Sequence, residues 1–453
     1  MDDLKPALRG GRLTPDDYSK NFSDLHPPLN RHEAAVEADR CYFCYDAPCM
    51  TACPTAIDIP LFIRQISTDN AIGAARTILD QNILGGMCAR VCPTETLCEE
   101  ACVRNTAEEK PVEIGLLQRY ATDKAMAEGQ QFYERSDDTG KRVAIVGAGP
   151  AGLACAHRVA MAGHDAVILE ARDKAGGLNE YGLAAYKTTE DFAQKEIAYL
   201  LEIGGIEIRC NQALGRDFTL EDLRRDYDAV FIGIGLGDVN ALRIPGEDLK
   251  GCENAVDFIE TLRQAEDLAS VKVGSSVVVL GGGMTAIDAA VQAKLLGAEE
   301  VTLCYRRGAD AMGASKFEQE LAASKGVFMR HYLAPKEILG EDGDVTGVLF
   351  EQTEIVDGRV KLTGETGVIA ADHVLKAIGQ SFVTEHLNSL KFEGGRIAVD
   401  ADGRTSLPDV WAGGDCIKQG EDLTVTSVAQ GRDAAMAINK VLAGENAGVS
   451  AVA

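Results

Sequence analysis

The sequence has no long apolar run and few basic residues. No uninterrupted apolar run reaches the roughly 18–20 residues that a membrane-spanning helix needs. Residues 1–5 lack the basic flank and apolar stretch of a secretory signal. Lys and Arg number 45 against 70 Asp and Glu, which gives a net charge of −25. Because nucleic acids and anionic membranes are bound through clustered Lys and Arg, we expect a cytoplasmic protein that binds neither.

Cysteine, in contrast, is plentiful. The 453 residues include 13 cysteines, and eight of them fall between Cys41 and Cys102. Thiols in the cytosol stay reduced, so this concentration requires another explanation than disulfides. The length predicts about two to four domains, and the cysteine-rich region is one of them.

The eight cysteines form two runs with short spacings, each with one Cys-Pro step: Cys41-x2-Cys44-x4-Cys49-x3-Cys53 and Cys88-x3-Cys92-x5-Cys98-x3-Cys102. Three thiolates on a short loop can bind one iron–sulfur cluster, and in two-cluster ferredoxins the fourth cysteine binds the other cluster. By this logic Cys53 and Cys102 each cross over, and the region holds two [4Fe–4S] clusters. Structural zinc is the main alternative, although only Cys41 and Cys44 form a C-x2-C pair of the usual zinc kind.

The cysteine-rich region is predicted to be helical. Asp58 and Pro60 mark a helix start, with Phe62, Ile63 and Ile66 on one face. Asn70 caps a second helix, whose inward-facing residues are Ile72, Ala75, Ile78 and Leu79. The polar stretch 136–140 is a linker to the next domain.

After residue 141, short β-branched runs alternate with helical patterns, which is typical of a parallel α/β fold. The first unit opens with a strand at 143–146, followed by Gly147, Gly149 and Gly152 and a helix over 151–162. Glu170 ends the next strand, 166–169. These glycines let the backbone approach a pyrophosphate at a helix N-terminus, and the carboxylate accepts from ribose hydroxyls. The unit therefore predicts an FAD site, to which Gly177 also belongs.

A second FAD motif follows far downstream. Gly414 and Asp415 end the run 410–415, and Asp415 is expected to contact the ribityl–phosphate side of FAD. Gln430 is expected to open a helix that faces the flavin. A glycine turn of this kind is common by itself, and its pairing with the first motif makes FAD the better interpretation.

Between the two FAD motifs lies a second nucleotide-binding unit. A strand at 277–280 precedes Gly281, Gly283 and Thr285, and the following strand, 301–305, ends in Arg306 and Arg307. Two guanidinium groups suit a 2′-phosphate, which favours NADPH over NADH; a solvated basic loop is the alternative. Gly379 completes the candidate NAD(P)H-binding residues.

The predicted fold class is multidomain α and α/β, with the NAD(P) domain inserted in the FAD domain. The predicted parts are residues 1–138 (helical, two clusters), 139–268 (FAD, first part), 269–378 (NAD(P)H) and 379–453 (FAD, second part).

Nearly the whole chain resembles the N-terminal, FAD and NADPH domains of dihydropyrimidine dehydrogenase, and in particular the NAD(P)-dependent subunit of the bacterial enzyme. The resemblance is carried by the segments 46–49, 53–55, 73–75, 91–94 and 115–118. It implies that one cluster is bound by Cys41, Cys44, Cys49 and Cys102. The other cluster is implied to use Cys53, Cys92, Cys98 and the amide oxygen of Gln118. From the residues alone, Cys88 is the natural fourth ligand of that second cluster.

The family resemblance also implies a function. The chain is expected to oxidise NAD(P)H on FAD and to pass electrons through the clusters to an FMN- and iron–sulfur-containing catalytic subunit that reduces uracil or thymine. The chain ends soon after the second FAD motif, so we expect it to need that subunit. The small subunit of glutamate synthase, built on the same plan, is the alternative. A thioredoxin reductase would need a CxxC near the flavin, and no CxxC exists beyond Cys44; a zinc-stabilised assembly subunit is the non-enzymatic alternative.

Overall fold

The computed structural model describes residues 8–444, so the predicted absence of a signal at residues 1–5 lies outside the described residues. The chain divides into two compact units. The larger unit comprises His26–Glu180, Glu190–Gly237 and Phe382–Ala453, and the other comprises Met1–Leu25, Tyr181–Thr189 and Asp238–Ser381. The second nucleotide-binding region is therefore inserted in the first, which confirms the predicted order. The finer division into four parts at residues 138, 268 and 378 stays a prediction.

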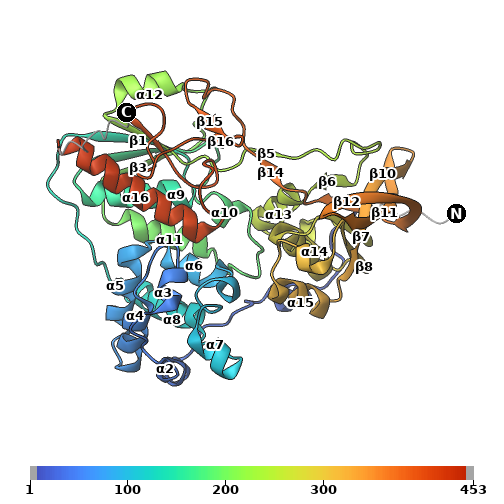
Figure 1. Cartoon of the computed structure of the whole chain (residues 1–453), viewed down its shortest axis with the longest axis horizontal. Helices are drawn as coiled ribbons and strands as arrows, with labels where there is room; N and C mark the ends of the chain where they lie inside the picture. The colour runs from blue at the N-terminus through green and yellow to red at the C-terminus, as the bar shows by residue number, and fades with distance from the viewer. Residues whose placement is uncertain (1–7, 445–453) are drawn as a thin grey trace. The chain divides into compact units, whose positions relative to one another are not determined.

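Within the larger unit, short helices carry the two cysteine runs (Figure 1). The predicted helix starts are confirmed. Asp58 accepts from the N–H of Leu61, and Asn70 accepts from the N–H of Gly73. The apolar faces of these helices form one core with α8, which explains the 3.6-residue spacing of their buried side chains. The helices are α2 (Arg31–Asp39), α3 (Pro48–Ala52), α4 (Ile59–Ser67), α5 (Ala71–Gln81), α6 (Gly85–Val91), α7 (Val103–Glu108) and α8 (Ile114–Ala127).

The same unit contains a parallel five-stranded sheet in the order β17-β4-β1-β2-β3. Its central strands are almost entirely buried, as the β-branched runs predict. Helices α9 and α16 pack side by side along it (Figure 1). The elements are β1 (Arg142–Val146), β2 (Asp165–Leu169), β3 (Ile206–Arg209), β4 (Ala229–Ile232), β17 (Val410–Ala412), α9 (Pro150–Met161), α10 (Leu178–Tyr181), α11 (Phe192–Leu201), α12 (Leu220–Asp226), α16 (Thr424–Leu442) and the small hairpin β15 (Phe392–Glu393) and β16 (Arg396–Ile397).

The other unit is built around a second parallel sheet, in the order β6-β13-β7-β8-β9. An antiparallel sheet of the long strands β10, β11 and β12 adjoins it. The elements are α1 (Pro15–Asn21), β6 (Cys252–Asn254), α13 (Ala255–Gln264), β7 (Ser276–Leu280), α14 (Met284–Leu295), β8 (Glu300–Tyr305), α15 (Lys316–Ser324), β9 (Phe328–His331), β10 (Leu333–Glu341), β11 (Asp344–Val356), β12 (Arg359–Ala370), β13 (His373–Lys376), and the pair β5 (Asp238–Val239) and β14 (Gln380–Ser381).

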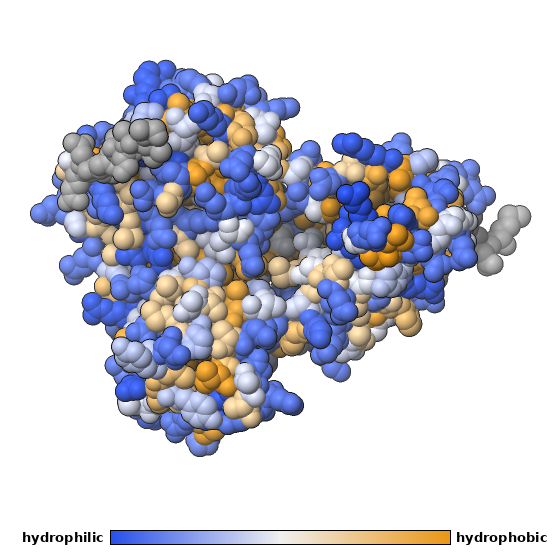
Figure 2. Space-filling model, viewed as in Figure 1, coloured by the Kyte–Doolittle hydropathy of each residue, from blue (hydrophilic) through white to orange (hydrophobic). Residues whose placement is uncertain are grey.

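The surface seen in Figure 2 is mostly hydrophilic, with apolar residues scattered among polar ones. Within residues 8–444, no helix is long and apolar enough to cross a bilayer.

Candidate functional site

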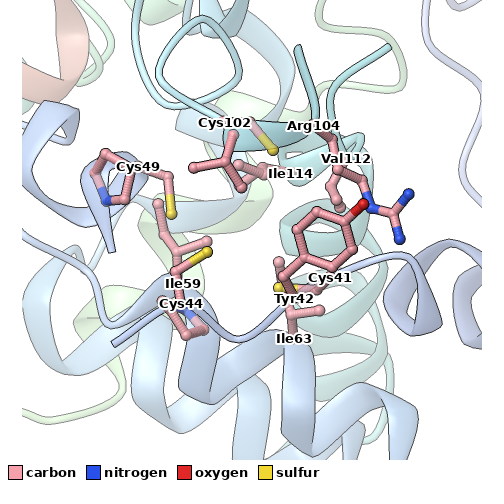
Figure 3. Close-up of a pocket in the computed structure, with 13 residues that line it drawn as sticks. Cys41, Tyr42, Cys44, Cys49, Ile59, Ile63, Cys102, Arg104, Val112 and Ile114 are labelled. Carbon is pink, nitrogen blue, oxygen red and sulfur yellow. The ribbon is translucent and has the colours of Figure 1, made fainter. Parts of the chain in front are cut away.

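The first cysteine cavity is formed by Cys41, Cys44, Cys49 and Cys102, and their four sulfur atoms surround a shared space (Figure 3). Cys41 and Cys44 lie on the loop before α3, and Cys102 comes from the second run, directly before α7. The rest of the wall is mainly apolar and includes Ile59 and Ile63. Thiol ligands in an apolar shell are the donor set that an iron–sulfur cluster requires.

The second cysteine cavity contains Cys53, Cys88, Cys92 and Cys98 together with Gln118. Cys102 of the second run thus lies with three cysteines of the first run, and Cys53 of the first run lies with three of the second. This arrangement agrees with the predicted crossover. The amide nitrogen of Gln118 donates to the carbonyl of Gly85 at 2.7 Å, so its amide oxygen is the end left for the cavity. Cys88 lies on α6, and its thiol is next to that of Cys92, which directly follows this helix. Both candidates for the fourth ligand therefore line this cavity, and their ligand roles stay predictions.

Burial makes both cavities unfavourable for isolated thiolates. It raises the pKa of Cys49 to about 12 and raises the pKa of Cys98 well above its ordinary value. Thiolates would be stabilised there by the positive charge of bound iron. The N–H of Phe43 donates to the sulfur of Cys41, and the hydroxyl of Thr55 lies 3.2 Å from the sulfur of Cys53. Such hydrogen bonds to sulfur also tune cluster potentials.

A mononuclear zinc site needs its ligands to converge on one point, with each sulfur about 2.3 Å from the metal. Among residues 8–444, no group of three His, Cys, Asp or Glu side chains is arranged in that way. The described residues therefore offer no mononuclear zinc site of this kind.

The first glycine-rich loop is shaped for a close approach of a nucleotide. Gly147 has φ +99°, and a Cβ on Gly152 would lie 2.0 Å from the carbonyl oxygen of Gly147. A Cβ on Gly177 would lie 2.8 Å from the Cα of Gly149, so the loops that carry these glycines touch. Glu170 accepts from the N–H of Ala148 at 2.7 Å and thereby fixes the loop. The cradle fits the pyrophosphate and ribose of FAD.

The second FAD motif adjoins this loop. A Cβ on Gly414 would lie 3.2 Å from the side chain of Ala151, in the first turn of α9. Burial raises the pKa of Asp415 to about 6, and the hydroxyl of Ser427 donates to its carboxylate. Gln430 does not begin a helix as predicted, because α16 begins at Thr424. Its amide is engaged at both ends, by the N–H of Gly414 and the carbonyl of Gln419, so Gln430 positions the turn that carries Asp415.

In the other unit, Gly281, Gly283 and Thr285 line a cavity of about 580 Å³ together with Arg306 and Gly379. Gly281 has φ +151°, and a Cβ there would lie 2.1 Å from the carbonyl of Ala377, which explains the glycine. The cavity opens at the N-terminus of α14, where backbone N–H groups favour phosphate.

The two predicted arginines differ in position. Arg306 lines the cavity, and Arg307 is not among the residues around it. Both are exposed. Among the described residues, neither guanidinium makes a hydrogen bond or ion pair, so Arg306 is available for an anionic group of a nucleotide.

Three further residues beside the cysteine region have no predicted role. Arg432 donates to the carbonyls of Thr55 and Gln81, and so ties α16 to the segments beside both cysteine runs. Asn82 lines the second cysteine cavity. Glu196 accepts from two N–H groups at the start of α6. No local motif marks such residues, because their roles depend on partners that are distant in sequence.

The second cysteine cavity also borders the FAD-type elements. Val425, in the first turn of α16, belongs to its wall. Ser427, two residues further on, holds Asp415. Within the larger unit, the second cavity therefore lies next to the helix that carries part of the FAD motif.

Comparison with protein families identifies two regions. A model of dihydropyrimidine dehydrogenase domain II, 4Fe-4S cluster, matches residues 18–130. A model of pyridine nucleotide-disulphide oxidoreductase matches residues 141–431. The two matches cover the cysteine cavities and both nucleotide-binding regions.

Characterised relatives match over almost their full length. The NAD-dependent dihydropyrimidine dehydrogenase subunit PreT of Escherichia coli (strain K12) is 35% identical over 94% of this chain and 98% of its own. The glutamate synthase [NADPH] small chain of the same organism is 34% identical over 91% of this chain and 92% of its own.

Solved structures share the nucleotide-binding fold. Mycobacterium tuberculosis FprA in complex with NADPH has a TM-score of 0.57 and 22% identity, covering 68% of this chain and 87% of that one. Thioredoxin reductase of T. acidophilum has a TM-score of 0.52 and 22% identity, covering 66% and 97%. At these identities the likeness concerns the fold alone.

Proposed function

Because the chain belongs to the pyridine nucleotide-disulphide oxidoreductase family and carries the 4Fe-4S domain of dihydropyrimidine dehydrogenase, we propose that it is the electron-input subunit of a dihydropyrimidine dehydrogenase. It is an NAD(P)H-dependent iron–sulfur oxidoreductase, in agreement with relatives that match nearly all of their length. The substrate, the partner and the number of clusters are what we propose beyond this family assignment. The two separate cysteine cavities, in the unit that also holds the FAD-type loops, support the number of clusters. The substrate and the partner are supported by the dihydropyrimidine dehydrogenase subunit that matches nearly the whole chain.

Bound FAD would take up hydride from NAD(P)H, and two [4Fe–4S] clusters would carry the electrons away one at a time. The protein supplies position and environment for this chemistry. In the larger unit, Gly147, Gly149 and Gly152 leave space for the pyrophosphate, while Glu170 and Asp415 offer carboxylates to ribose and ribityl hydroxyls. In the other unit, Gly281, Gly283, Thr285, Arg306 and Gly379 form the NAD(P)H cavity.

The clusters are assigned to the two cysteine cavities. The first would be held by Cys41, Cys44, Cys49 and Cys102. The second would be held by the three thiolates of Cys53, Cys92 and Cys98 and the amide oxygen of Gln118. The anchoring of the Gln118 amide nitrogen on Gly85 supports this choice, because it leaves the oxygen free.

The residues in the walls of the two cavities support an order of the cofactors. Val425 of α16 belongs to the second cavity, whereas the first cavity has no residue from α9 or α16 in its wall. The first cavity instead includes Tyr42, which is half exposed. We assign the second cluster to the FAD side and the first to the side from which electrons leave for the partner.

The proposed partner is supported by the relative that is 35% identical, which is a dihydropyrimidine dehydrogenase subunit. On that basis the electrons reach an FMN- and iron–sulfur-containing subunit that reduces uracil or thymine to the 5,6-dihydro forms. A thioredoxin reductase would need a redox-active CxxC pair near the flavin. The cysteines beyond Cys102 are single and far apart in sequence: Cys155, Cys210, Cys252, Cys304 and Cys416.

The test is anaerobic purification of the chain, alone and co-expressed with an FMN- and iron–sulfur-containing catalytic subunit of dihydropyrimidine dehydrogenase. We expect one FAD and about eight irons per chain, for two four-iron clusters. The chain alone should oxidise NAD(P)H with an artificial acceptor, and only the complex should reduce uracil. Stoichiometric zinc in place of iron would contradict the cluster assignment. Glutamate formation by the complex, without uracil reduction, would assign the chain to glutamate synthase.

A further inference from the structure

Asn82 is a buried polar residue at the second cysteine cavity that no part of the proposed function yet uses. It follows the last residue of α5 and is completely buried. Together with Cys53, Cys92, Cys98 and Gln118, it belongs to the wall of that cavity. Its role can therefore be judged from the hydrogen bonds that it makes and those that it lacks.

The orientation of the Asn82 amide is fixed. Its Oδ1 accepts from the N–H of Leu84 at 3.1 Å. Rotation of the amide by half a turn would place its own N–H₂ group against that N–H, which cannot bond. The backbone is held as well, because the N–H of Asn82 donates to the carbonyl of Ile78 and the preceding Gln81 is bound by Arg432.

The other end of the amide has no partner. Among the described residues, Nδ2 of Asn82 is a buried donor without an acceptor. A buried donor without a partner is energetically unfavourable, so native proteins rarely leave one unsatisfied. The cavity that it borders is lined by thiols, and sulfur in a bound cluster is negatively polarised and accepts hydrogen bonds.

We propose that Asn82 donates a hydrogen bond from Nδ2 to a sulfur of the second cluster and thereby raises its reduction potential. This rests on the proposed function, which places a cluster in that cavity. A donor aimed at sulfur stabilises the reduced, more negative state more than the oxidised state. The Gln118 ligand acts in the same direction, because a neutral oxygen replaces a negative thiolate.

The first cysteine cavity provides an internal control. Its wall contains neither asparagine nor glutamine. A change at Asn82 should therefore alter the potential of one cluster only, whereas a general disturbance of the fold would alter both.

The test is a redox titration of the whole purified chain, followed by electron paramagnetic resonance of both reduced clusters. Asn82→Leu removes the donor, and Asn82→Asp removes it while keeping the acceptor for the N–H of Leu84. In both variants we expect the equilibrium constant for reduction of the second cluster to fall about tenfold. For one electron this lowers its reduction potential by about 59 mV. The first cluster should not change. Asn70→Asp is the matched control, since it alters the cap at the opposite, exposed end of α5 and should leave both potentials unchanged.

Unchanged potentials in both Asn82 variants, with two clusters present, would overturn the proposal and indicate that a buried water satisfies Nδ2. Should both variants lose the second cluster, the wild-type chain with ¹⁵N-labelled asparagine decides the question. A ¹⁵N coupling to the second cluster in pulsed spectra supports the hydrogen bond, and its absence overturns it. A wild-type chain without clusters would instead contradict the proposed function.

Discussion

At the scale of single residues, the clearest distinction is between the neighbours Arg306 and Arg307. Both follow β8 directly or within one residue, but only Arg306 lines the cavity that we assign to NAD(P)H. A guanidinium at a 2′-phosphate contributes about 1.5–3 kcal/mol, which corresponds to roughly tenfold or more in affinity. The sequence offered both arginines for this role, and the structure favours one.

We expect Arg306→Gln to raise the KM for NADPH at least about tenfold and to leave the KM for NADH almost unchanged, because only NADPH carries the 2′-phosphate. Arg307→Gln is the matched control and should have a smaller effect on both. Steady-state kinetics with an artificial acceptor measures these values. Equal losses for the two nucleotides in Arg306→Gln would contradict the assignment.

The fourth ligand of the second cluster can be decided by another residue pair. Gln118→Ala should weaken or remove this cluster, whereas Cys88→Ser should leave both clusters intact. Gln118→Glu should retain the cluster at a lower potential, because the new ligand adds a negative charge. Iron content and electron paramagnetic resonance are the measurements. Loss of a cluster in Cys88→Ser, with none in Gln118→Ala, would make Cys88 the ligand.

At the scale of elements, α6 connects the second cysteine cavity to the FAD-type part of the same unit. Glu196 of α11 accepts from the N–H groups of Gly86 and Met87, in the first turn of α6, at 2.8 and 3.0 Å. The ring of Phe192, also on α11, stacks on Arg90 of α6. These contacts hold a helix that carries Cys88 and ends just before Cys92.

Glu196 should also make stability depend on pH. Burial raises its pKa to about 8 from a usual value of 4.5. A group whose pKa is raised on folding stabilises the folded protein fully at pH values below the pKa that the group has in the unfolded chain. This stabilisation is lost as the pH rises through the pKa that the group has in the folded protein. Glu196→Gln should therefore become more stable relative to wild type between pH 5 and 9, by on the order of 3 kcal/mol.

Thermal unfolding of both proteins across this pH range measures the effect. Glu202→Gln, at the exposed end of α11, is the control and should show no such trend. A pH-independent difference between Glu196→Gln and wild type would mean that Glu196 stays ionised in the folded protein.

At the scale of the whole molecule, the chain enters and leaves its two compact units several times. The segment Tyr181–Thr189 belongs to the unit that contains the NAD(P)H cavity, although it follows the first FAD motif in sequence. Lys187 explains its place, because its ammonium is buried between Asp288 and Glu318 at 2.8 and 2.7 Å. A buried ammonium requires such partners, so these two ion pairs hold the segment in this unit.

The sequence by itself determined the parallel α/β units, the helix starts at Asp58 and Asn70, and the glycine-rich loops. Their physical basis is local: β-branched runs, caps and glycine conformations act over a few residues. The cysteine spacing likewise indicated iron–sulfur chemistry. The spacing also predicted the exchange of Cys53 and Cys102 between the two cavities, which the packing brings about. Only the tertiary structure decided that Cys88 lines the second cavity together with Gln118. It also decided that Arg306 rather than Arg307 meets the cavity, and that Asn82 keeps a free donor there, since these depend on partners brought together by packing.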